Sequence, residues 1–128
     1  MEQKKYKVLY VDDEEINLRL FIASYRRDFE IITCDSAKEA LKILETEKVD
    51  VVLTDQRMPE MTGVELLAEI DKKFPDIPPN RLMVSGYSRN EDIEKAFNEY
   101  KLYKFIRKPW SYEMLRSIIF KSIETKNE

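Results

Sequence analysis

Short apolar runs alternate with longer stretches of mixed polarity along the whole chain. Five of these runs are rich in β-branched and aromatic residues and have the length of strands: YKVLYV (6–11), FEIITC (29–34), VDVVLT (49–54), RLMVS (81–85) and YKFI (103–106). The stretches that follow them place apolar residues three and four positions apart, as amphipathic helices do. The pattern therefore predicts strands and helices in alternation.

Each predicted helix has its own apolar stripe. The stripes are Ile16, Leu20 and Ala23; Ala37, Ala40, Leu41 and Leu44; Val64, Leu67, Ile70 and Phe74; Ile93, Ala96, Phe97 and Tyr100; and Leu115, Ile118, Ile119 and Ile123. The capping-box pattern S/T-x-x-E marks three helix starts, at Ser36–Glu39, Thr62–Glu65 and Ser88–Glu91. When strands alternate with helices along a chain, the strands pair in parallel and the helices form right-handed crossovers between them. We therefore expect an α/β fold with one sheet covered on both faces.

Composition narrows the class of protein. The 128 residues suit a single domain, 1–128, and 43% hydrophobic with 37% charged residues is typical of a globular protein. No stretch approaches the roughly 18 apolar residues of a membrane span, and the N-terminal apolar run is too short for a secretory signal, so we expect a cytoplasmic protein. A net charge of −3 without a long basic stripe argues against binding nucleic acid directly or a membrane surface.

The residue types that the chain lacks exclude several chemistries. There is no histidine, which removes Ser-His and Cys-His catalysis and histidine metal ligands. Two glycines are too few for a glycine-rich nucleotide loop. The single cysteine, Cys34, is expected to be a small buried hydrophobe. Any metal must then be held by carboxylates.

The segment VLYVDDEE (8–15) runs a predicted strand straight into four carboxylates. Like charges about 5 Å apart repel by about 3 kcal/mol at an effective dielectric of about 20, so a counter-charge is expected. Ligands of such sheets bind beyond the carboxyl ends of the strands, where this chain has Asp12, Asp13, Asp55, Ser85 and Lys108. Carboxylates suit Mg²⁺, and a lysine with a hydroxyl suits a phosphoryl group. Phosphoryl chemistry is therefore the leading hypothesis.

Four pieces of sequence carry a family resemblance: VDDEE, TDQRMPEMTG, MVSGYS and FIRKPW, in this order along nearly the whole chain. With them the chain resembles the receiver domain of two-component response regulators, the CheY-like family. The resemblance implies a flavodoxin-like (βα)5 doubly wound sandwich with a five-stranded parallel sheet. It also implies a phosphoacceptor signalling switch that catalyses only its own phosphorylation and dephosphorylation.

The resemblance assigns the acidic residues. Asp55 would accept a phosphoryl group from a phosphohistidine of a sensor histidine kinase or phosphotransfer protein. Asp13, Asp55 and the backbone carbonyl of Arg57 would bind Mg²⁺, and Asp12 would help through a coordinated water. Arg57 and Tyr87, two residues beyond the acceptor and two beyond Ser85, would shield the phosphoryl group from water and prolong its lifetime; two exposed loop residues are the plainer interpretation.

The resemblance also implies a switch. Lys108 would pair with the phosphoryl oxygens, Ser85 would hydrogen-bond one of them, and Phe105 would fill the space that Ser85 vacates. The Lys108–Pro109 bond would be cis. The changed face, made by the fourth helix, fifth strand and fifth helix, would bind an output domain or a downstream protein, and a homodimer is left open. The chain is then either a stand-alone receiver or a piece of a longer regulator.

Each residue also has a simpler interpretation. Asp13 would cap the first helix, and Asp55 would be a turn residue. Ser85 would satisfy backbone groups at a strand end, Lys108 would be a solvated charge, and Phe105 would be core.

Three alternative functions remain open at this point. A phosphotransferase of the haloacid dehalogenase type also uses an aspartate after a strand with Mg²⁺, but it favours D-x-D where this chain has adjacent Asp12 and Asp13. A phosphate-independent receiver-like binding module would be expected to lack one of the five site residues, and all five are present. A structural domain without chemistry leaves the clustered charges unexplained.

Overall fold

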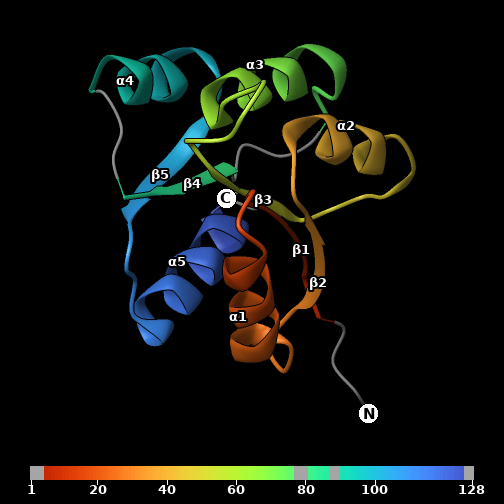
Figure 1. Cartoon of the computed structure of the whole chain (residues 1–128), viewed down its shortest axis with the longest axis vertical. Coiled ribbons are helices and arrows are strands. Elements are labelled where there is room, and N and C mark those ends of the chain that lie inside the picture. The colour runs from red at the N-terminus through yellow and green to blue at the C-terminus, as the bar shows by residue number, and fades with distance from the viewer. Residues whose placement is uncertain (1–4, 77–80, 87–89, 126–128) are drawn as a thin grey trace.

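The computed structural model describes residues 5–76, 81–86 and 90–125, and in this part of the chain strands and helices alternate (Figure 1). The elements in order are β1 (Lys7–Val11), α1 (Glu15–Tyr25), β2 (Glu30–Cys34), α2 (Ala37–Thr46), β3 (Val51–Asp55), α3 (Gly63–Lys73), β4 (Arg81–Ser85), α4 (Asn90–Glu99), β5 (Leu102–Arg107) and α5 (Tyr112–Thr125). The predicted alternation is confirmed, but the stripe predicted for the first helix is wrong. Ile16, Leu20 and Ala23 are exposed, and α1 buries Leu18, Phe21 and Tyr25 instead. Asp55 and Ser85 are the last residues of their strands.

The five strands form one parallel sheet in the order β2-β1-β3-β4-β5. Figure 1 shows α1 and α5 on one face of this sheet and α2, α3 and α4 on the other. Because all strands run in the same direction, their carboxyl ends meet at one edge, and β1 and β3 lie side by side at the centre. The predicted α/β sandwich is confirmed, and the ends of β1 and β3 are its natural site for chemistry.

The core is divided by the sheet into two apolar layers, because successive side chains of a strand point to opposite faces. Leu9 and Val11 of β1 belong to the layer under α2 to α4. Val8 and Tyr10 belong to the layer under α1 and α5. Cys34 is buried in the first layer, as expected, and burial raises the pKa of its thiol to about 12. A thiol in this state is an inert hydrophobe.

Helix caps match the sequence signals in part. Thr62 forms the full predicted capping box with Glu65, and at α2 the hydroxyl of Ser36 accepts the backbone N–H of Glu39. The Ser88–Glu91 pair includes a residue outside the described part of the chain. The N-cap of α1 is Glu14, and no side chain caps this helix. Asp13 is therefore not a helix cap, which leaves its carboxylate available to the site.

The turn after β3 is tied tightly to the start of α3. The N–H of Gly63 donates to the Gln56 carbonyl at 3.0 Å, and the Gln56 side-chain oxygen accepts the Val64 N–H at 2.8 Å. A Cβ placed on Gly63 would lie 2.5 Å from the backbone oxygen of Asp55 and 3.0 Å from the Cα of Gln56. Only glycine allows helix α3 to approach the end of β3 this closely.

We expect Gly63→Ala to lower the free energy of unfolding by about 2 kcal/mol, because the methyl group meets backbone atoms that cannot turn aside. Gly86→Ala is the matched control, since a Cβ there has no neighbour within 4 Å, and we expect a change below about 0.5 kcal/mol. Urea denaturation of both variants measures the difference. Equal stability of the two variants would contradict the close approach at Gly63.

Candidate functional site

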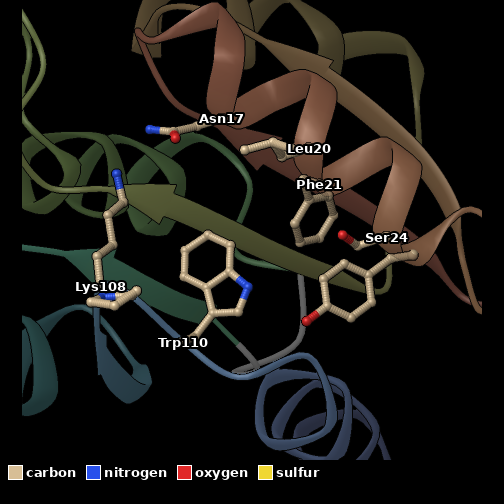
Figure 2. Close-up of a pocket in the computed structure, with 8 residues that line it drawn as sticks. Asn17, Leu20, Phe21, Ser24, Lys108 and Trp110 are labelled. Atoms are coloured by element: carbon tan, nitrogen blue, oxygen red, sulfur yellow. The ribbon is translucent and has the colours of Figure 1, made fainter.

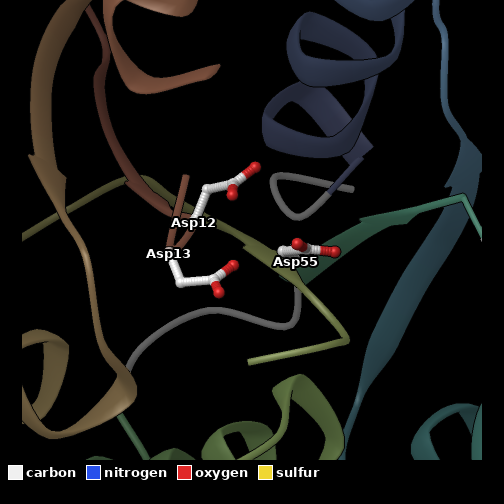
Figure 3. Close-up of side chains that lie close together, drawn as sticks. All are labelled: Asp12, Asp13 and Asp55. Atoms are coloured by element: carbon white, nitrogen blue, oxygen red, sulfur yellow. The ribbon is translucent and has the colours of Figure 1, made fainter. Parts of the chain in front are cut away.

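Three carboxylates converge at the carboxyl edge of the sheet. Asp12 and Asp13 follow β1, and Asp55 ends β3 (Figure 3). Each offers an oxygen, and these oxygens all lie within 4.8 Å of one another. Asp12 is fully buried and Asp55 is 4% exposed, whereas Asp13 is exposed. The predicted convergence of the three acids is thus present in the structure.

Lys108 supplies the positive counter-charge that the sequence predicts for the clustered acids. Its Nζ lies 3.0 Å from Oδ2 of Asp12 and 3.2 Å from Oδ2 of Asp55. The backbone N–H of Lys108 donates to the carbonyl of Ser85 at 3.1 Å, and the Lys108–Pro109 peptide bond is cis, as expected. These contacts show that Lys108 is not a solvated edge charge, because it joins the ends of β1, β3 and β4 through one side chain and one amide.

Electrostatics at the site favour a further cation. Burial raises the pKa of Asp55; the charge of Lys108 opposes this and that of Asp12 adds to it, so the net pKa lies above the ordinary range. Burial lowers the pKa of Lys108, but its contacts with Asp12 and Asp55 outweigh burial and keep the pKa above its usual value. Lys108 remains an ammonium, and one positive charge faces three carboxylates.

The site could hold a hard divalent cation. Carboxylate oxygens at this mutual spacing, with an excess of negative charge, are the donor set that Mg²⁺ prefers. Asp13 is the exposed member of the cluster and is open to a hydrated ion, while Asp12 and Asp55 are nearly enclosed. The residues therefore fit the cofactor that the resemblance implies.

The other predicted residues lie as follows. Ser85 is 1% exposed at the end of β4. Phe105 of β5 is half-buried, pairs with Met83 of β4 and packs against the core layer under α2 to α4. Arg57 is exposed in the turn after β3. Tyr87 lies outside the described residues. Strand alternation places Ser85 and Phe105 on the same face of the sheet, which is the arrangement that a coupled pair needs.

Two residues at the site are missing from the sequence prediction. The Tyr10 hydroxyl donates to Oδ2 of Asp12 at 2.6 Å, and the side-chain amide of Asn17 donates to the same oxygen at 3.1 Å. In the sequence, Tyr10 is indistinguishable from the other apolar residues of a strand, and Asn17 from any polar residue of a helix. The available signal was strand alternation, since residues two apart in a strand face the same side.

Comparison with known families decides the identity of the site. The response regulator receiver domain family matches residues 8–120, which include all of the acids and Lys108. The chain belongs to this family. It is a receiver domain of the kind found in two-component response regulators.

Several relatives of this receiver domain are named as transcriptional regulatory proteins. It is 37% identical to the hydrogenase transcriptional regulatory protein HoxA of Cupriavidus necator over 98% of this chain and 26% of the relative. It is 31% identical to the transcriptional regulatory protein GlrR of Escherichia coli over 97% of this chain and 28% of the relative. The chain thus spans about a quarter of the length of these relatives.

Solved structures show the same fold. A CheY-like response regulator receiver domain protein from Methanospirillum hungatei superposes with a TM-score of 0.88 at 26% identity, over 97% of this chain and 98% of the other. Among the described residues, no helix of this receiver domain is long and apolar enough to cross a membrane.

We expect Asp55→Asn to raise the melting midpoint near pH 7 in the absence of Mg²⁺, because the variant no longer holds a charge that burial disfavours. A raised pKa means that the folded state binds this proton more tightly than the unfolded chain. The contribution of Asp55 to the wild-type free energy of unfolding therefore falls as the pH rises from the ordinary pKa of 3.8 through the raised value.

The advantage of Asp55→Asn should accordingly shrink as the pH is lowered, since both side chains are then neutral. Thermal melts of the two proteins over the range from about pH 4 to pH 8 measure it. A lower midpoint for the asparagine variant at every pH would mean that the ion pair with Lys108 outweighs the cost of burying Asp55.

Proposed function

We propose that Asp55 is the phosphoacceptor of this receiver domain and takes its phosphoryl group from a phosphohistidine of a sensor histidine kinase or phosphotransfer protein. The observation that carries the proposal is the contact of Lys108 with Asp55 inside a cluster of three carboxylates. Asp55 ends β3, next to the strand that leads to Asp12 and Asp13. A donor phosphoryl group that reaches this edge meets an acid, an ammonium and a buried hydroxyl.

Transfer to Asp55 exchanges one bond to phosphorus for another. An oxygen of the Asp55 carboxylate attacks the phosphorus, a P–O bond forms while the P–N bond of the phosphohistidine breaks, and the electron pair of that bond returns to the imidazole nitrogen. Lys108 lies 3.2 Å from the attacking carboxylate and neutralises charge on the phosphoryl oxygens. Ser85, at the end of the neighbouring strand, donates a hydrogen bond from its hydroxyl to one of those oxygens.

Mg²⁺ completes the proposed site. Asp13, Asp55 and the backbone carbonyl of Arg57 would bind it, with Asp12 acting through a coordinated water. When bound, the ion neutralises the acids and the incoming phosphoryl oxygens. Because the transferred phosphoryl group stays on the domain's own Asp55, we infer a switch that catalyses its own modification rather than an enzyme.

In the proposed switch, a conformational change at Ser85 is followed by movement of Phe105. Both residues lie on the face of the sheet covered by α2 to α4, and Phe105 is the half-buried one. If Ser85 turns toward the phosphorylated Asp55, Phe105 can move into the space it leaves. This changes the face of α4, β5 and α5, which we propose as the surface for an output domain, a downstream protein or a second copy of the chain.

Family membership supports the remaining assignments. We propose a single domain, 1–128, in the cytoplasm, where response regulators generally act, without direct contact to nucleic acid or membrane. The names of the relatives suggest a transcriptional output for the whole protein. Shielding of the phosphoryl group by Arg57 and Tyr87 stays a prediction; the exposure of Arg57 in the turn after Asp55 is compatible with it.

Acetyl phosphate with Mg²⁺ should add one phosphoryl group to the wild-type protein and none to Asp55→Asn, because the amide is a poor nucleophile. Intact-mass measurement shortly after mixing detects the adduct. Asp50→Asn is the matched control, since Asp50 lies near the opposite end of β3 and should leave the yield unchanged. Modification of Asp55→Asn with the wild-type yield would exclude Asp55 as the acceptor.

Mg²⁺ should stabilise the wild-type fold by mass action, by about 1.4 kcal/mol at tenfold excess over its Kd. Asp13→Ala should remove most of this gain, because Asp13 is the exposed ligand of the cluster. Thermal melts across a Mg²⁺ titration measure both effects. If Mg²⁺ raises the midpoints of wild type and Asp13→Ala equally, the metal is not bound at this cluster.

A further inference from the structure

Tyr10 places a phenol hydroxyl beneath the acidic site. Its side chain is fully buried in β1, and its ring packs against Phe21 at 4.5 Å and edge-on against Trp110 at 6.3 Å between ring centroids. The hydroxyl donates to Oδ2 of Asp12 at 2.6 Å. Burial, and then this hydrogen bond, raises the pKa of Tyr10 above its ordinary value, so the hydroxyl stays a donor at neutral pH.

Asp12 accepts hydrogen bonds from four donors. Its Oδ2 accepts from Tyr10, from the side-chain amide of Asn17 at 3.1 Å and from Nζ of Lys108 at 3.0 Å. Its Oδ1 accepts the backbone N–H of Glu14 at 3.0 Å. Each oxygen of an ionised carboxylate has about two acceptor positions, so the three donors at Oδ2 fill that oxygen, while Oδ1 keeps a position open toward a water of a hydrated ion.

Lys108 differs from the other donors because it is shared. Tyr10, Asn17 and Glu14 contact Asp12 within the β1–α1 segment, whereas Lys108 also contacts Asp55. Asn17 and Lys108 line one end of a pocket of about 520 Å³ between α1 and the segment after β5 (Figure 2). Figure 2 shows the ammonium of Lys108 on the side of Asn17, with the ring of Trp110 below the ammonium. The ammonium is the donor with room to leave Asp12.

We propose that Tyr10 is a positioning residue of the acidic site: its hydroxyl keeps the buried Asp12 hydrogen-bonded, so that Lys108 is free to leave Asp12 when a cation or a phosphoryl group arrives. This rests on the proposed function. A buried carboxylate that loses a donor binds the remaining ones more tightly, because an unsatisfied buried charge is costly. Without the Tyr10 hydroxyl, Asp12 retains Lys108 at the shared position, where the ammonium opposes entry of Mg²⁺.

The test is the Mg²⁺ concentration that gives half of the rise in melting midpoint, measured for the wild type and Tyr10→Phe. Loss of an outer-shell hydrogen bond of this kind weakens metal binding by about 10-fold or more, so we expect a shift of about tenfold to higher Mg²⁺. Tyr25→Phe is the matched control. Tyr25 is a fully buried tyrosine of the same aromatic cluster, and its hydroxyl donates to the Tyr112 carbonyl at 3.0 Å, away from the acids.

To distinguish the proposed role of Tyr10 from a purely structural one, the Mg²⁺ titrations with Tyr10 and with Tyr10→Phe are repeated in a Lys108→Met background. With no ammonium to retain, removal of the Tyr10 hydroxyl should change half-saturation by less than about twofold, whereas a packing defect would persist. Three results would overturn the proposal. Tyr10→Phe could reach half-saturation within about twofold of the wild-type Mg²⁺ concentration, Tyr25→Phe could shift that concentration equally, or the shift could persist undiminished in the Lys108→Met background. A wild type that does not respond to Mg²⁺ would overturn the metal site itself, a different result.

Discussion

One ammonium group joins the ends of three strands. Nζ of Lys108, just beyond β5, contacts Asp12 beyond β1 and Asp55 at the end of β3. Removing this ammonium would leave two nearly enclosed carboxylates without a counter-charge, and loss of one partner of a buried ion pair typically costs about 3–5 kcal/mol. The strand order brings β1 and β3 together at the centre of the sheet, and the hydrogen bond from the Lys108 amide to Ser85 brings the lysine to the same edge. The geometry of the site therefore depends on the topology of the whole sheet.

Strand ends were the predictable part of this receiver domain. Apolar runs locate all five strands, and a parallel arrangement requires their carboxyl ends to share an edge, so Asp55, Ser85 and Lys108 were placed together without any contact being known. The repulsion expected between adjacent acids also predicted a counter-charge. The first inference uses a property that every parallel sheet shares and the second uses the repulsion between like charges, and neither depends on how individual side chains pack.

Contacts that depend on packing were not predictable. Tyr10 is one of several apolar residues in β1, and although strand alternation puts it on the same side as Asp12, the sequence does not indicate that its hydroxyl reaches that carboxylate. The cap of α1 is another case. An aspartate before a helix is a good N-cap by propensity, yet the helix begins after Glu14, and Asp12 uses the Glu14 amide to satisfy its own carboxylate. The burial of Asp12 overrides local preference, because a buried carboxylate gains more from a donor than an exposed helix end does.

Adjacent acids have different environments in this site, and the fold explains why. Asp12 continues the pleat of β1 and points to the side of Tyr10, where it is fully buried and accepts hydrogen bonds from four donors. Asp13 follows it on the other side of the backbone and is exposed (Figure 3). One carboxylate is therefore fixed in a hydrogen-bonded position while its neighbour keeps its oxygens available to solvent and ions. A spacing of two residues, as in D-x-D, would send both acids to the same side and remove this difference between them.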